Sequence, residues 1–171
     1  MSARGWQREV AALVDAALGG APAAAIGLAP GGRLDCRAAS GDGWPPGASG
    51  PRGLGDPLPF ADGSLASVAV TLLAWTPADG PWRPLLEEAR RVLGPGGRLV
   101  LVDHNRPRRR WPALLAVVRA PAPPGPSPAA RWRRLAHPAA REAQAAGFVV
   151  DALRLAAGER VQVVSARPRP S

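Results

Sequence analysis

Two stretches of the chain carry apolar residues at the spacing of an amphipathic helix. The first covers residues 6–18 and is closed by Gly19-Gly20. The second lies just before Gly94, and its apolar face consists of Leu85, Leu86, Ala89, Val92 and Leu93. Glycine readily adopts left-handed backbone angles and proline cannot continue a helix. The run Gly94-Pro95-Gly96-Gly97 therefore predicts a left-handed cap at Gly94 and then a sharp turn.

Unbroken apolar runs predict strands that are buried on both faces. Runs of this kind cover residues 23–28, 68–74 and 99–102. Residues 29–57 are dominated by Gly, Pro, Ser and Ala and show no hydrophobic period. We expect this segment to be mostly loop, with one short strand at 34–38.

The C-terminal third is expected to combine helices with a β-hairpin. The predicted elements are an apolar helix at 111–119, a proline-rich connection at 120–128, a helix at 128–146 ended by Gly147, and strands at 148–155 and 160–166. A tight turn at Ala157-Gly158-Glu159 makes the two strands an antiparallel pair. Strands that alternate with helices and then end in a hairpin indicate an α/β fold with a mostly parallel sheet. At 171 residues we expect a single domain, residues 1–171.

The formal charge of +9 allows two interpretations. A basic surface attracts an anionic partner such as nucleic acid. However, the chain has no lysine, is rich in Ala, Arg, Gly and Pro, and spreads its arginines widely apart from a group at 106–110. This pattern favours a compositional origin of the charge, so nucleic acid is not an expected partner. The group at 106–110 is either a solvated charge run or an attractant for a phosphate or carboxylate.

Several classes of protein are excluded by what the sequence lacks. Cys36 is the only cysteine, so neither an intramolecular disulfide nor a cysteine-based zinc site is possible, and we expect no metal. No apolar run is long enough to span a bilayer and no signal-peptide core is present, so we expect a cytoplasmic protein. A nicotinamide dehydrogenase needs Gly-x-Gly-x-x-Gly after its first strand, and this motif is absent.

Two sequence blocks resemble the class I S-adenosylmethionine-dependent methyltransferases, specifically the type 11 group related to small-molecule and lipid methyltransferases. The first block is PLLEEARRVLGPGGRLVLVD at residues 84–103, which is similar to the family's helix ending in R-V-L-x-P-G-G-R-L and its strand ending in aspartate. The second is DPLPFADGSL at residues 56–65, which is similar to the family's D…LPF-x-DGSFD segment. The resemblance covers about residues 54–167. It implies a Rossmann-like methyltransferase sheet with a C-terminal antiparallel hairpin.

The resemblance also implies that S-adenosylmethionine is the cofactor. In the family a glycine-rich loop after the first strand approaches the cofactor, and the matching positions here are Gly27, Ala29 and Gly31. A plain turn after a strand is the alternative interpretation of these three residues. Further cofactor contacts are implied at Asp56, Leu58, Leu72 and Leu73.

The first half of the chain is shorter than the family requires. Gly31 and Asp56 are only 25 positions apart, where the family has a helix, a strand and a further helix. Because a crossover between parallel strands takes a dozen or more residues, we expect the sheet to lack about one βα unit. The family's ribose-binding carboxylate has only poor candidates in Asp35 and Asp42.

Polar residues that follow the strand at 99–102 are the candidates for catalysis, because ligands bind at the carboxyl ends of strands in open α/β sheets. His104 is the candidate base, since an imidazole titrates near neutral pH, and Asp103 would orient it or the methyl acceptor. The alternative is that Asp103 caps the next segment and His104 is a solvent-facing loop residue. Asn105 and Trp75 are the candidate substrate contacts, although Trp75 also suits an ordinary core position.

The sequence thus predicts an S-adenosylmethionine-dependent methyltransferase that transfers a methyl group in line to an unidentified small molecule. The alternative is a catalytically inactive methyltransferase-like scaffold or partner protein, because the half that would hold the cofactor is shortened. Both interpretations are compatible with a homo- or hetero-oligomer.

Overall fold

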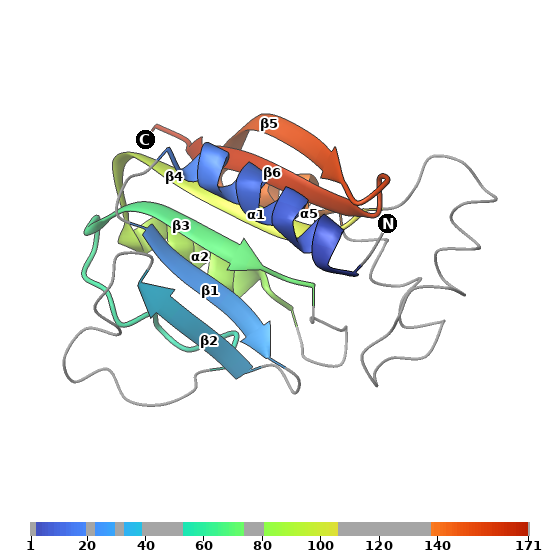
Figure 1. Ribbon diagram of the computed structural model, residues 1–171. Coiled ribbons are helices and arrows are strands. Elements are labelled where there is room, and N and C mark those ends of the chain that lie inside the picture. The colour runs from blue at the N-terminus through green and yellow to red at the C-terminus, as the bar shows by residue number, and fades with distance from the viewer. Residues whose placement is uncertain are drawn as a thin grey trace.

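The computed structural model describes residues 3–19, 23–29, 33–38, 53–73, 81–105 and 138–170. The helices are α1 (Ala3–Leu18), α2 (Arg83–Val92) and α5 (Ala139–Ala145). The strands are β1 (Ala23–Ala29), β2 (Arg33–Ala38), β3 (Leu65–Thr71), β4 (Leu93–His104), β5 (Phe148–Ala156) and β6 (Val161–Pro168). Within the described residues they form one six-stranded sheet in the order β2-β1-β3-β4-β6-β5 (Figure 1).

The sheet is mixed: β1, β3 and β4 form a parallel centre and the chain ends in an antiparallel hairpin, which confirms the predicted α/β fold class, while β2 adds a second antiparallel pair at the other edge. β1 pairs with β3 and β3 pairs with β4 in parallel. β6 is antiparallel to both β4 and β5, so β5 runs in the same direction as β4. The predicted turn joins β5 to β6 through three consecutive residues of positive φ, which are Ala157, Gly158 and Glu159. The first half of the helix predicted at 128–146, and the helix predicted at 111–119, lie outside the described residues.

The pairing of β1 with β2 shows how the first half of the sheet is shortened. β2 is antiparallel to β1, with Ala29 opposite Arg33 and Ala24 opposite Ala38. Only residues 30–32 separate the two strands, and a link of this length allows an antiparallel neighbour but no crossover helix. The expected loss of about one βα unit therefore corresponds to a hairpin in place of a strand–helix–strand connection. The short strand predicted at 34–38 is confirmed as β2, which begins one residue earlier.

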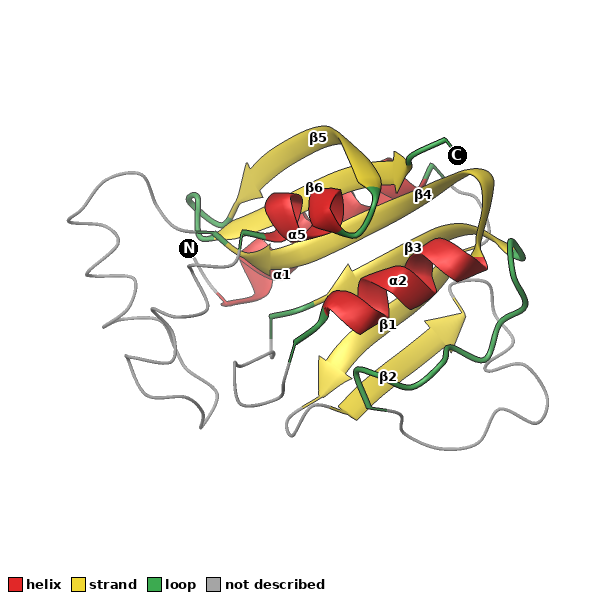
Figure 2. Cartoon of the chain, turned by 180° about the vertical axis from the view of Figure 1, so that it is seen from behind, coloured by secondary structure: helices red, strands yellow, loops and turns green. Residues whose placement is uncertain are grey.

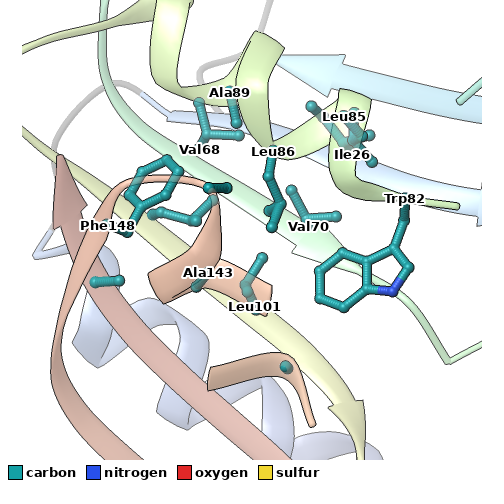
Figure 3. Close-up of a cluster of buried hydrophobic side chains, with 14 of the residues drawn as sticks. Ile26, Val68, Val70, Trp82, Leu85, Leu86, Ala89, Leu101, Ala143 and Phe148 are labelled. Carbon is teal, nitrogen blue, oxygen red and sulfur yellow. The ribbon is translucent and has the colours of Figure 1, made fainter. Parts of the chain in front are cut away.

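The sheet is covered by α1 on one face and by α2 and α5 on the other (Figures 1 and 2). Successive side chains of a strand point to opposite faces, and the two buried clusters follow this alternation. In β4, Leu99 and Leu101 belong to the cluster under α2 and α5, whereas Val100 and Val102 belong to the cluster under α1. Figure 3 shows side chains of α2 and α5 meeting those of the strands in the larger cluster, with Phe148 beneath α5.

The junction between α2 and β4 differs from the prediction. Leu93 is already extended, with φ −75° and ψ 128°, and the left-handed glycine is Gly96, with φ 74°, so the predicted left-handed cap at Gly94 is wrong. Gly94 is instead close to the chain before β3, because a Cβ atom at Gly94 would lie 2.8 Å from the carbonyl oxygen of Gly63. Residues 94–97 form an irregularity in β4, since Leu65 pairs with Leu93 but Ser67 pairs with Arg98.

Arg91 joins the two sequence blocks that carry the family resemblance. Its Nη1 donates to the carbonyl oxygen of Phe60 at 2.9 Å and to Asp62 Oδ1 at 2.6 Å. Its Nη2 donates to the carbonyl oxygen of Leu58 at 2.9 Å and to Glu88 Oε2 at 2.7 Å. Glu88 Oε2 also accepts a hydrogen bond from the backbone nitrogen of Leu58 at 2.8 Å. The segment before β3 is therefore fixed along α2 by one ion-pair network.

This network predicts an acid-sensitive contribution to stability. Hydrogen bonding to Arg91 lowers the pKa of Glu88 below its ordinary value, against the opposing effect of burial. A carboxyl group whose pKa is lowered on folding stabilises the native state above its unfolded-state value of 4.5, and this stabilisation is lost as the pH falls through the folded-state value. We expect the free energy of unfolding to fall below pH 4.5 more steeply in the wild-type protein than in Glu88→Gln. Urea unfolding between pH 7 and pH 3 measures this, with exposed Glu87→Gln as the control. Equal pH slopes for wild type and Glu88→Gln would contradict it.

Candidate functional site

The carboxyl ends of β1, β3 and β4 lie side by side at one edge of the sheet. Gly27 pairs with Thr71, and Thr71 pairs with Val102, so the last residue of β3 is level with positions two residues before the ends of β1 and β4. Leu72 continues the alignment, because its backbone nitrogen donates to the carbonyl oxygen of Val102 at 2.8 Å. The edge predicted from the order of strands and helices is therefore formed, and it brings together Leu72, Leu73, Asp103, His104 and Asn105.

Asp103 is a buried carboxylate at the end of β4. Only 3% of its surface is exposed, and its Oδ1 accepts a hydrogen bond from the backbone nitrogen of His104 at 2.7 Å. Its cross-strand partner is Gln162 of β6, which is 5% exposed. By the alternation of β4, both side chains lie on the face covered by α2 and α5. Asp103 is thus part of the strand, and its carboxylate binds the backbone nitrogen of the next residue of the same strand.

His104 is the last residue of β4 and is half-buried, so it is not the solvent-facing loop residue of the alternative interpretation. Its Nε2 lies 3.2 Å from the carbonyl oxygen of Leu73. Because a carbonyl oxygen can only accept a hydrogen bond, this contact assigns the proton of the neutral ring to Nε2. In this tautomer Nδ1 is the ring nitrogen without a hydrogen.

Asn105 connects the edge to the hairpin of β5 and β6. Its side-chain Nδ2 donates to the carbonyl oxygen of Glu159 at 2.9 Å, and its backbone nitrogen donates to that of Arg160 at 2.8 Å. These bonds hold the left-handed turn against the end of β4. Asn105 was predicted to contact the substrate, and the structure shows that its side chain binds the turn between β5 and β6.

The residues predicted to form the cofactor loop do not form one in the described part of the chain. Gly27 and Ala29 lie within β1, where Gly27 pairs with Asp35 on one side and Thr71 on the other. Gly27 is paired on both sides, so its backbone groups serve the sheet and do not fit the glycine-rich cradle that the resemblance implies, whereas Ala29 pairs only with Arg33 of β2. Asp35, one poor candidate for the ribose carboxylate, is in β2 opposite Gly27.

The other predicted cofactor contacts are distributed between the core and the surface. Leu58 and Leu72 are fully packed in the cluster under α2 and α5, and Leu73 is half-buried beside the cluster under α1. Asp56 is exposed, and its Oδ2 accepts a hydrogen bond from the backbone nitrogen of Gly53 at 2.7 Å. The predicted positions Gly31, Asp42, Trp75 and 106–110 lie outside the described residues.

Gln162 is a residue of this edge that the sequence motifs do not indicate. Its signal is a polar residue between two valines in the final strand, at a position whose hairpin register places it on the buried face. Its Nε2 donates to the carbonyl oxygen of His104 at 3.0 Å. Within the described residues there is no cluster of three or more side chains suited to hold a metal ion, and none of the helices is long and apolar enough to cross a membrane.

No family model and no curated protein matches this chain. Solved structures are similar to it at low identity. A SAM-dependent methyltransferase from Aquifex aeolicus is 18% identical with a TM-score of 0.42, over 66% of this chain and 50% of that chain. A SAM-dependent methyltransferase from Thermotoga maritima is 14% identical with a TM-score of 0.42, over 67% of this chain and 61% of that chain. A chain in the complex between the Haloferax volcanii Trm112 methyltransferase activator and a methyltransferase is 14% identical with a TM-score of 0.45, over 69% of this chain and 59% of that chain. The chain thus spans between half and about three fifths of the length of these matches.

Proposed function

We propose that this chain is an S-adenosylmethionine-dependent methyltransferase acting on an unidentified small molecule. The observation that supports this most is the edge where β3 and β4 end. There the parallel strands of the resembling blocks place Asp103 and His104 beside Leu72 and Leu73. Ligands of open α/β sheets bind at this edge. The final antiparallel hairpin of β5 and β6 is also the one that the resemblance implies.

The chemistry asked of these residues is modest. S-adenosylmethionine supplies a methyl group that is already activated, so the protein mainly excludes water and aligns the acceptor. A base assists when the acceptor is a hydroxyl or a protonated amine. With Nε2 bonded to Leu73, His104 would take the acceptor's proton at Nδ1. Asp103, whose carboxylate binds the backbone of His104, would keep the end of β4 in place.

A methyltransferase-like scaffold without activity is the second candidate, and one observation favours it. Gly27 and Ala29, the described part of the predicted glycine loop, are residues of β1 that pair with β2. A chain that keeps the sheet and lacks this cradle is suited to stabilise another subunit. Cofactor binding distinguishes the two candidates.

Calorimetric titration with S-adenosylmethionine and S-adenosylhomocysteine tests the proposal. We expect saturable binding of both, weakened at least about tenfold by Gly27→Val, because a β-branched side chain is added at the carboxyl end of β1. Ala25→Val is the matched control, since Ala25 is on the same strand and the same face but one step further from the edge. No heat with either ligand at millimolar concentration would reject the enzyme and favour the scaffold. Equal weakening by both variants would reject the placement of the site.

A further inference from the structure

The backbone of His104 is held by two buried polar side chains. Asp103 accepts from its nitrogen at 2.7 Å, and Gln162 donates to its carbonyl oxygen at 3.0 Å. Asp103 and Gln162 are themselves cross-strand partners on the same face of the sheet. The peptide groups on both sides of His104 are thus bonded by one carboxylate and one amide.

The register explains why side chains are used at this point. The backbone nitrogen of Asn105 donates to the carbonyl oxygen of Arg160, which makes Asn105 and Arg160 a hydrogen-bonded pair of the antiparallel ladder. Because such pairs alternate, the backbone groups of His104 point away from β6 and toward β3. β3 pairs with β4 only as far as Thr71 and Val102. Beyond this last pair, the side chains of Asp103 and Gln162 bond the backbone nitrogen and the carbonyl oxygen of His104.

Gln162 lies at a buried position where a polar side chain is energetically unfavourable unless it is hydrogen-bonded. One pair further along the same face, β6 and β4 contribute Val164 and Leu101, both fully buried, and the row continues with Val70 of β3. An amide in such surroundings is tolerated only when it is hydrogen-bonded, and an aliphatic side chain would pack there without that requirement. Packing of the core therefore does not explain the amide, whereas its hydrogen bond to the end of β4 does.

We propose that Gln162 is a positioning residue for His104. By fixing the carbonyl oxygen of His104 it keeps the end of β4 in the geometry in which Nε2 binds the carbonyl oxygen of Leu73 and Nδ1 is the proton acceptor. The inference rests on the proposed function, because positioning matters only if His104 meets a substrate. Gln162 acts through His104 and is not itself placed against the reacting atoms.

The test is the tautomer of His104, read from nitrogen shifts of the ¹⁵N-labelled full-length protein above the pH at which imidazole titrates. The chain has two histidines, and His137→Gln assigns the signals. We expect the wild-type ring to carry its proton on Nε2. Gln162→Met keeps the size of the side chain and removes the donor, so the bond from Nε2 to Leu73 should be lost as the end of β4 shifts, and the preference should fall about fivefold, the effect of losing one hydrogen bond of typical net strength. Gln144→Met, at an exposed position of α5, is the matched control and should leave the ratio unchanged.

An unchanged tautomer ratio in a folded Gln162→Met protein would overturn the proposal. If that variant does not fold, the wild-type protein decides: a Gln162 side-chain amide that exchanges with solvent as fast as that of Gln144 would also overturn it. Cofactor titration of the wild type is read separately. Absent cofactor binding with an intact tautomer effect rejects the proposed function, whereas binding with no tautomer effect rejects the role of Gln162 alone.

Discussion

Replacing Arg91 by alanine is expected to lower the free energy of unfolding by about 3 kcal/mol. The guanidinium binds four separate acceptors, which are the carbonyl oxygens of Leu58 and Phe60 and the carboxylates of Asp62 and Glu88. Its loss leaves the half-buried Glu88 carboxylate without its cation. It also releases the segment before β3, whose Leu58 is packed in the core. Urea unfolding followed by circular dichroism measures the change.

Arg83→Ala is the matched control for this experiment. Arg83 is an exposed arginine in the same helix, and its replacement is expected to change the free energy of unfolding by less than about 0.5 kcal/mol. Similar losses for Arg91→Ala and Arg83→Ala would show that the network around Arg91 contributes nothing specific. In that case the two resembling sequence blocks would be joined by core packing alone.

Gly94→Ala is expected to destabilise the protein by about 2 to 3 kcal/mol through crowding of two backbone segments. The added Cβ atom would be 2.8 Å from the carbonyl oxygen of Gly63, a distance at which one of the two must move. Neither moves freely. Gly63 donates its backbone nitrogen to the carbonyl oxygen of Arg91 at 2.9 Å, and Gly94 follows directly on the paired Leu93. The same unfolding measurement reports the effect.

Gly55→Ala provides the comparison, because a Cβ atom at Gly55 would meet no atom within 4 Å and the residue has no positive φ. We expect that variant to lie within about 0.5 kcal/mol of the wild type. If Gly94→Ala were as stable as Gly55→Ala, the close approach between the segment before β3 and the start of β4 would be wrong.

The elements of the second half could be predicted from the sequence because their patterns are local and periodic. The helical spacing of Leu85, Leu86 and Ala89, and the unbroken run at 99–102, each define an element from neighbouring residues. The role of Gly94 could not be predicted in this way, since it depends on Gly63, which is distant in the sequence. A glycine after a helix suits both a left-handed cap and a close contact, and only the fold distinguishes them.

The sequence predicted where the candidate site residues lie in the sheet but not which groups they bind. The strand order placed Asp103 and His104 at the carboxyl end of their strand, and the structure has them there. Their partners come from segments that the local pattern does not connect with them. Leu73 bonds His104 from the neighbouring strand, and Gln162 reaches it from a strand 58 positions away. Residue types define candidate chemistry, but cross-strand register decides which atoms are already engaged.

The hairpin of β1 and β2 also has a consequence for the order of folding. Its partners are separated by between 4 and 14 positions along the chain, whereas β1 and β3 join residues 44 positions apart. Closing a short loop loses less chain entropy than closing a long one, and local pairs form faster. The hairpin of β1 and β2 is therefore expected to form before β1 pairs with β3. β3 would then add to a strand whose other side is already hydrogen-bonded to β2.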